Sequence, residues 1–211
     1  MNFRYTIFIL FLLSTQVLRA QTWNSVRAEK LYQQAVVEIK QQKALKSLEE
    51  AIKLNPAHID AQVQLARIYM AQKHYDQSIR TAQLVLRASP EYEDVYYYII
   101  GSYLSKNRPA EALRYVEMGL SRFNANKDFG IKKLNILDML KRYQDGDSWA
   151  QVLIRRFPTD GSVRLAMAGH YEAKADWYKS NKMDNLANSY YEKALELAPK
   201  NTDLIEKLNN I

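Results

Sequence analysis

Small and apolar side chains recur along the chain at the spacing of an amphipathic helix. In the segment 44–56, Ala44, Leu48 and Ala51 lie four and three residues apart, so they share one helix face. Pro56 ends that helix, because proline has no amide hydrogen to donate and disfavours helical geometry in the residue before it. The pattern predicts a helix that buries one face and stops at the proline.

The same four positions recur downstream at a nearly fixed distance. Thirty-four residues separate successive copies, except that the fifth copy comes forty-one residues after the fourth. The later copies hold Ser78, Ala82, Val85 and Pro90; Ala112, Val116, Gly119 and Asn124; Gly146, Ala150, Leu153 and Pro158; and Ala187, Tyr191, Ala194 and Pro199. A fixed period of this length is typical of solenoids built from stacked helical hairpins.

The segment 66–90, ARIYMAQKHYDQSIRTAQLVLRASP, resembles the tetratricopeptide repeat (TPR), which has small, aromatic and terminal proline positions in this order. The resemblance implies an all-α, right-handed superhelical solenoid of about five helix-turn-helix units, closed by a capping helix. We expect a signal peptide at 1–20 and a repeat domain at 21–211. The expected units are 25–58, 59–92, 93–126, 127–160 and 161–201, and the expected capping helix is 202–211.

Three positions depart from the family pattern: Asn124 replaces the proline in the third copy, and the other two lie in the fourth copy. Lys133 stands where an aliphatic residue is expected, and Gly146 stands where alanine is usual. We therefore expect the helix that contains Gly146 to begin late, near Asp147 or Ser148.

The fifth copy carries seven extra residues, around 175–184. Seven residues make nearly two helical turns, so both helices of this unit can lengthen without rotating their buried faces. Trp177 and Tyr178 then lie near the tip of a longer hairpin. These rings either cover the lengthened core or offer a contact surface.

The first twenty residues have the three-part order of a secretory signal peptide. Arg4 precedes an uncharged apolar run at 5–13, and a polar stretch leads to the small residue Ala20. Cleavage after Ala20 predicts a periplasmic or secreted protein with no membrane span in the mature chain. The alternative is an uncleaved anchor in the inner membrane, although the run is shorter than the roughly 20 residues that span a bilayer.

Composition favours a bacterial setting and gives no sign of a nucleic-acid partner. The chain has no cysteine to form a disulfide or carry a lipid, and no Asn-x-Ser/Thr glycosylation site. Without residues 1–20 the formal charge is 28 basic minus 23 acidic residues, or +5. This excess is spread over the chain without a basic run, which is typical of solvated helix faces.

The sequence predicts no catalytic, cofactor or metal site, so we do not expect an enzyme. The three histidines, at 58, 74 and 170, lack metal-ligand spacing, and His170 and Glu172 lie about 200° apart on a helix. Gly146, Asp147 and Ser148 lack the strand-turn-helix context of a serine hydrolase, and Ser148 with Gln151 has the spacing of a helix start.

The resemblance also implies a ligand groove, because first helices of TPR proteins line a concave surface. The positions that match are Gln33, Gln64, Arg67, Tyr97, Tyr98, Gly101, Lys132 and Asn135. Tyr96, Tyr97 and Tyr98 point 100° apart, so they cannot all enter one core. We expect Tyr96 in the core, at least one of the other two rings at the surface, and a shallow dent at Gly101.

These features predict a non-catalytic scaffold or adaptor of the bacterial envelope, without a cofactor. The expected partner is a protein whose extended peptide or helix lies in the groove. Similar repeats belong to complexes for secretion, outer-membrane assembly or exopolysaccharide export, which the resemblance suggests as settings. The alternative function, binding of a cell-wall glycan or polysaccharide, rests on the tyrosine-rich and mildly basic surface.

Overall fold

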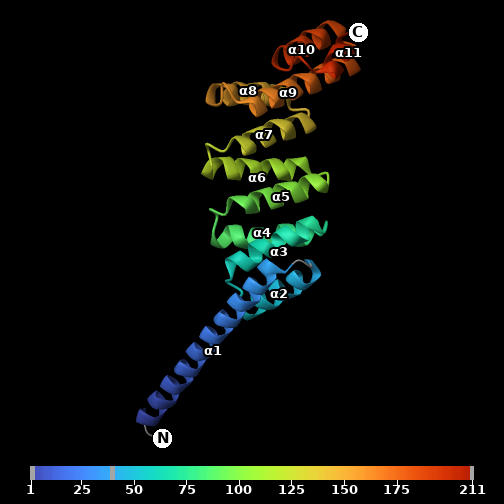
Figure 1. Cartoon of the computed structure of the whole chain (residues 1–211). Coiled ribbons are helices and arrows are strands. Elements are labelled where there is room, and N and C mark those ends of the chain that lie inside the picture. The colour runs from blue at the N-terminus through green and yellow to red at the C-terminus, as the bar shows by residue number, and fades with distance from the viewer. Residues whose placement is uncertain (1–2, 39–40, 210–211) are drawn as a thin grey trace. The chain divides into compact units, whose positions relative to one another are not determined.

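The computed structural model describes residues 3–38 and 41–209, which form eleven helices and no strand (Figure 1). The predicted all-α class is confirmed. The helices are α1 Phe3–Val37, α2 Gln41–Leu54, α3 Ile59–Ala71, α4 Tyr75–Ala88, α5 Glu93–Ser105, α6 Pro109–Arg122, α7 Lys127–Met139, α8 Tyr143–Arg156, α9 Gly161–Ser180, α10 Asp184–Leu197 and α11 Thr202–Asn209.

The chain divides into two compact units, residues 1–102 and 103–211, with the boundary near the end of α5. In the first unit α1 packs on α2, α2 on α3, and α3 on α4. In the second unit α7 packs on α6, α8 and α9, and α10 packs on α9 and α11.

The turns that join α3 to α4, α5 to α6, α7 to α8 and α9 to α10 share one backbone geometry. Each has three residues, and the middle one is left-handed: Lys73 (φ 62°), Asn107 (φ 54°), Lys141 (φ 57°) and Lys182 (φ 59°). The next amide bonds back to the helix, as His74 N–H does to the Tyr69 carbonyl at 2.8 Å. This Schellman closure ends the helix and reverses the chain within three residues.

In the first unit, the core joins α1, α2 and α3 through small side chains. The predicted stripe of Ala44, Leu48 and Ala51 is buried, with 4%, 1% and 0% of each residue exposed. It packs against Ala28 and Ala35 of α1 and against α3 in one cluster. Tyr96, the ring expected in the core, is fully buried.

Towards its N-terminus, α1 extends beyond this core. Residues 16–27 are exposed, and the predicted cleavage site after Ala20 lies within this exposed stretch. Cleavage itself stays a prediction. None of the helices, over the residues described, is both long and apolar enough to cross a membrane.

The seven extra residues lengthen only the first helix of the last pair. The helix α9 has 20 residues, against 13 in α3, α5 and α7, whereas α10 has 14, like α4, α6 and α8. The expectation that both helices lengthen was therefore wrong.

The reason is that α9 contributes to two hydrophobic clusters, one towards each end of the helix. Near its start, Val163 and Met167 pack with side chains of α7 and α8. Nearer its end, Ala175 packs with Ala187, Tyr191 and Ala194 of α10 and with Leu204 of α11. The buried residues of α10 belong to the later cluster, and Leu197 at its C-terminal end packs against the earlier one, so α10 needs no extra length.

A buried polar layer on α9 separates these clusters. The His170 side chain is fully buried, with Nδ1 2.5 Å from Asp138 Oδ1 of α7 and Nε2 3.1 Å from Asp147 Oδ1 of α8. One turn further along α9, Lys174 pairs with the other oxygen of Asp147. Two carboxylates thus face a histidine and a lysine inside the second unit.

This layer explains the glycine at position 146. A Cβ atom built on Gly146 would overlap the His170 imidazole, so alanine does not fit there. The helix α8 begins at Tyr143 and includes Gly146, and Ser148 Oγ bonds to the Gln144 carbonyl at 3.0 Å in mid-helix. The expected late start near Asp147 was wrong, because the glycine admits the imidazole without breaking the helix.

Lys133 is accommodated by an aromatic neighbour. Its Nζ lies 4.6 Å from the centre of the Trp149 ring and 3.0 Å from Glu117 Oε1. The Trp149 indole is fixed in turn, since its Nε1 donates to the Gly130 carbonyl at 2.8 Å. The cation–π contact of Lys133, together with its half-buried aliphatic stem, thus replaces the aliphatic packing of other repeats.

We predict opposite effects of alanine at two helical glycines. Gly146→Ala should lower the free energy of unfolding by about 1–3 kcal/mol, because the new methyl group crowds His170. Gly169→Ala should raise it by about 1 kcal/mol, since Gly169 is an exposed helix position with open space around a Cβ. Urea denaturation followed by circular dichroism measures both. Shifts in the same direction would contradict the packing described.

The His170 layer predicts a pH dependence of stability. Burial disfavours the imidazolium, but the bond and charge of Asp138, and then those of Asp147, outweigh burial and raise the pKa of His170. Because the pKa of His170 is higher in the folded chain, its protonation stabilises the fold. This stabilisation is fully present below the unfolded pKa of about 6.5 and is lost as pH rises through the folded pKa. Tyr143 and Tyr171 also contact the ring.

We expect the urea midpoint to fall with pH above about 6.5 in the unaltered protein and to fall less in His170→Gln. His74→Gln is the control, because His74 is exposed and its side chain makes no cap hydrogen bond. Equal pH slopes in the unaltered protein and His170→Gln would refute the role given to this histidine.

Candidate functional site

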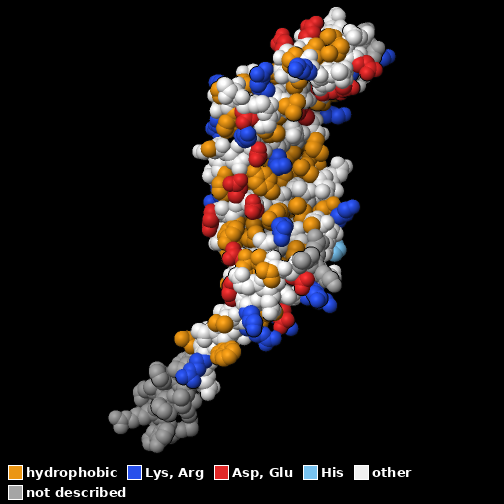
Figure 2. Space-filling view, viewed as in Figure 1, with side chains coloured by type: hydrophobic (Ala, Val, Ile, Leu, Met, Phe, Trp, Pro, Cys, Tyr) orange, Lys and Arg blue, Asp and Glu red, His pale blue; other side chains and the backbone are white. Residues whose placement is uncertain are grey.

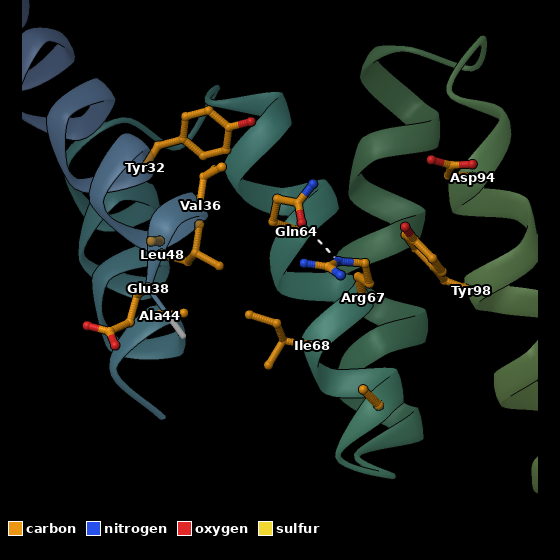
Figure 3. Close-up of a pocket in the computed structure, with 12 residues that line it drawn as sticks. Tyr32, Val36, Glu38, Ala44, Leu48, Gln64, Arg67, Ile68, Asp94 and Tyr98 are labelled. Carbon is orange, nitrogen blue, oxygen red and sulfur yellow. Dashed lines mark hydrogen bonds between the residues drawn. The ribbon is translucent and has the colours of Figure 1, made fainter. Parts of the chain in front are cut away.

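The first unit contains a pocket of about 480 Å³ bordered by α1, α2, α3 and α5 (Figure 3). This volume falls within the range of roughly 300–1,000 Å³ that is usual for ligand sites. The lining residues are Tyr32, Ala35, Val36, Glu38, Ala44, Leu48, Gln64, Arg67, Ile68, Ala71, Asp94 and Tyr98.

The floor of the pocket is apolar and belongs to the core of the unit. Ala35, Ala44, Leu48 and Ile68 contribute to it, and each is at most 7% exposed. Val36, beside this floor, is 55% exposed, so the apolar surface continues to the rim. An aliphatic side chain that enters the pocket would contact buried hydrocarbon on several sides.

The polar groups come from α3 and α5. Arg67 Nε donates to Gln64 Oε1 at 2.9 Å, one turn apart on α3 (Figure 3). The other guanidinium N–H groups make no hydrogen bond to the residues described, so they are available to a ligand. The pair holds the charge of Arg67 at the pocket wall.

Tyr98 extends from α5 towards Arg67, and Asp94 lies one turn before it on the same helix (Figure 3). Burial and the charge of Asp94 raise the pKa of Tyr98, and the charge of Arg67 opposes them. The phenol therefore stays protonated at neutral pH and can both donate and accept a hydrogen bond. The apolar floor can hold a hydrophobic side chain, and the polar wall can bond to the amide groups beside that side chain.

The structure brings together three of the eight predicted groove residues: Gln64, Arg67 and Tyr98. Tyr97 is half-buried and does not line the pocket. Gln33 is exposed and donates to Glu29 Oε1 at 2.7 Å. At Gly101, a Cβ would lie 3.3 Å from Met70 Sδ, so the methionine occupies the place where a dent was expected.

Lys132 and Asn135 lie on α7 in the second unit, the first half-buried and the second exposed. Their part in a groove stays a prediction. Sequence reasoning missed the floor of the pocket, because Ala44 and Leu48 carry only the signal of core positions. The structure alone shows that Val36 and Val37 are exposed next to buried Ala35.

The other candidate for chemistry is the layer around His170. Its polar contacts are with carboxylates and a lysine, and they include no serine or threonine hydroxyl among the residues described. Over residues 3–38 and 41–209, no group of three or more His, Asp or Glu side chains is placed to hold a metal ion.

Two family profiles, both described as tetratricopeptide repeat, match the chain at residues 40–88 and 171–201. The first match covers α2 to α4, of which α2 and α3 line the pocket, and the second begins in α9. None of the curated proteins matches the chain.

Several solved structures share the fold. The TPR protein YrrB, described as having an unusual peptide-binding site, is 16% identical over 79% of this chain and 82% of its own, with a TM-score of 0.61. MamA from Desulfovibrio magneticus RS-1 is 13% identical over 84% and 97%, with a TM-score of 0.60. A tetratricopeptide repeat protein from Parabacteroides merdae ATCC 43184 is 14% identical over 92% and 88%, with a TM-score of 0.58.

At these identities the likeness concerns the fold alone, and it confirms the predicted stack of TPR-like helix pairs. Proteins of this kind are generally scaffolds for protein–protein interaction and are typically non-catalytic. The chain thus resembles tetratricopeptide repeats in sequence over residues 40–88 and 171–201, and it shares their fold of stacked helix pairs.

Proposed function

We propose that this protein is a non-catalytic scaffold of the bacterial envelope that holds a partner protein by an extended segment in the pocket of the first unit. The observation that carries the proposal is the arrangement of Gln64, Arg67 and Tyr98 beside an apolar floor. A repeat protein with this pocket needs no reactive group to act, because its function is to bind.

The pocket suits a peptide for two physical reasons. An aliphatic side chain on the floor gains about 25 cal/mol for each Å² of apolar surface removed from water. The amides that flank this side chain can bond to Tyr98 and to the donors and acceptors of Arg67 and Gln64 that their mutual bond leaves over. The Gln64–Arg67 bond fixes one of these groups in advance, which lowers the entropy lost on binding.

The fold of YrrB, which is described as peptide-binding, supports the same reading at the level of the fold. The setting in the envelope rests on residues 1–20, with their basic start, apolar run and small residue before Gln21. Within the envelope, complexes for secretion, outer-membrane assembly or exopolysaccharide export are the settings that we propose. N-terminal sequencing of the protein from cell fractions tests the location. A periplasmic chain that starts at Gln21 supports export, and an intact chain in the inner membrane supports the anchor.

We predict that Tyr98 is at the binding site and that its neighbour Tyr97 is not. A photo-crosslinking amino acid at position 98 should trap a partner protein in living cells, and the same group at 97 should trap much less. For the peptide identified in this way, Tyr98→Ala or Arg67→Ala should each weaken binding by about 2 kcal/mol, the usual cost at a central aromatic or arginine contact. Isothermal titration calorimetry measures the change.

Tyr97→Ala and Arg80→Ala are the matched controls, since the first alters an adjacent ring and the second an exposed arginine of α4 outside the pocket. Equal losses in all four variants would point to unfolding or to another site. Sedimentation with purified wall material tests the glycan alternative. Wall binding that depends on Tyr98, without any trapped protein, would replace the peptide proposal.

A further inference from the structure

The extra turns of α9 build a second pocket, which lies in the second unit and has a volume of about 500 Å³. A helix of 13 residues beginning at Gly161 would end at residue 173, before three of the lining residues. The pocket is lined by Lys141, Arg142, Tyr143, Gln144, Asp145 and Asp147, and by Lys174, Trp177 and Tyr178 of the lengthened helix.

The charges of this pocket leave one cation without a partner. Arg142 Nε lies 2.7 Å from Asp145 Oδ2, and Lys174 pairs with Asp147, so these four charges cancel. Lys141 is exposed and forms no ion pair with any residue that the structure describes. Lys141 is the middle residue of the tight turn between α7 and α8, and its backbone is left-handed (φ 57°).

The apolar part of the pocket is a corner made by three aromatic rings. The Tyr143 and Trp177 rings lie 5.8 Å apart at 48°, and the Trp177 and Tyr178 rings lie 5.0 Å apart at 66°. The tilted rings enclose the corner from two sides, which suits an aromatic or aliphatic side chain.

The pocket also offers uncommitted hydrogen-bond donors on a wall that is held in place. Within the described part of the chain, Trp177 Nε1 and the side-chain amide of Gln144 have no hydrogen-bond partner, so both can bond to a peptide backbone. Lys174 is 5% exposed and is joined through Asp147 to His170, which fixes α8 against α9 behind the pocket.

We propose that this pocket binds an acidic segment of a partner polypeptide. A carboxylate side chain of the segment pairs with Lys141, and a neighbouring aromatic or aliphatic side chain lies in the corner of Tyr143, Trp177 and Tyr178. The inference stands apart from the pocket of the first unit and does not depend on it.

Indole NMR signals of the full-length chain test the proposal directly, because the protein has only three tryptophans. The probe is the blocked peptide acetyl-Glu-Glu-Phe-Glu-Glu-amide. It should shift the indole signal of Trp177, assigned with Trp177→Phe. The signal of Trp149, whose indole is bonded to Gly130, and that of Trp23 on α1 should stay in place. The same peptide with Gln for Glu should bind roughly 2- to 5-fold more weakly.

Lys141→Glu should weaken binding of the acidic peptide by roughly 5- to 10-fold, and higher salt should weaken it further. Lys73→Glu is the matched control, because Lys73 is exposed at the same place in an equivalent turn, with φ 62°. Arg67→Ala and Tyr98→Ala should leave this binding unchanged, which separates it from the proposed function.

Three results would overturn the proposal. One is an unshifted Trp177 signal at millimolar acidic peptide, and another is equal binding of the Gln peptide. The third is an equal effect of Lys141→Glu and Lys73→Glu. A Trp177 shift produced by an acidic oligosaccharide but not by the peptide would assign the pocket to glycans instead.

Discussion

Close contact between helices through small side chains is the constraint on which both units depend. Ala51, Ala61, Ala82, Ala112 and Ala150 are each 0% exposed, and each lies on a helix face that meets a neighbour. An alanine buries little surface itself, but it lets two backbones approach until larger side chains from both helices touch. A helical hairpin cannot cover such a face alone, so each pair needs the next. Residues outside these faces, such as Gln64 and Arg67, then reach the surface.

This constraint explains why the sequence predicts so much of the fold. A period of thirty-four residues repeats the same contact, so each copy of the small-residue stripe supports the others. Local signals also suffice to predict where these helices end, because Pro56 and its equivalents follow the last helical residues. The prediction fails at positions whose partner is distant in sequence. Gly146 contradicts the family pattern until His170, twenty-four residues later, is seen to fill its place. Lys133 is likewise explained only by Trp149 on the next helix.

The residues of the candidate pocket also fall into those that the sequence predicts and those that it does not. Gln64, Arg67 and Tyr98 occupy repeat positions that face a groove in related proteins, so the resemblance finds them. The floor is made by Ala35, Leu48 and other core residues, and no sequence pattern separates a core residue at a pocket from one that is covered. Whether a buried face is covered depends on how the end of α1 meets α2 and α3, which is a matter of tertiary packing.

The insertion in α9 shows how a repeat protein gains a surface without losing its core. Seven residues rotate a helix by about 700°, within roughly 20° of two full turns, so the buried face after the insertion keeps its direction. The first cluster on α9 is then unaffected, and a second forms two turns later with α10 and α11. The surface between them can carry polar residues, because it belongs to neither core. His170 and Lys174 occupy its buried side, where paired charges fix one arrangement of α7, α8 and α9. Removing one partner would leave an uncompensated buried charge, so the layer resists slippage of α9 against its neighbours. Trp177 and Tyr178 lie just beyond it, on a support that is already rigid.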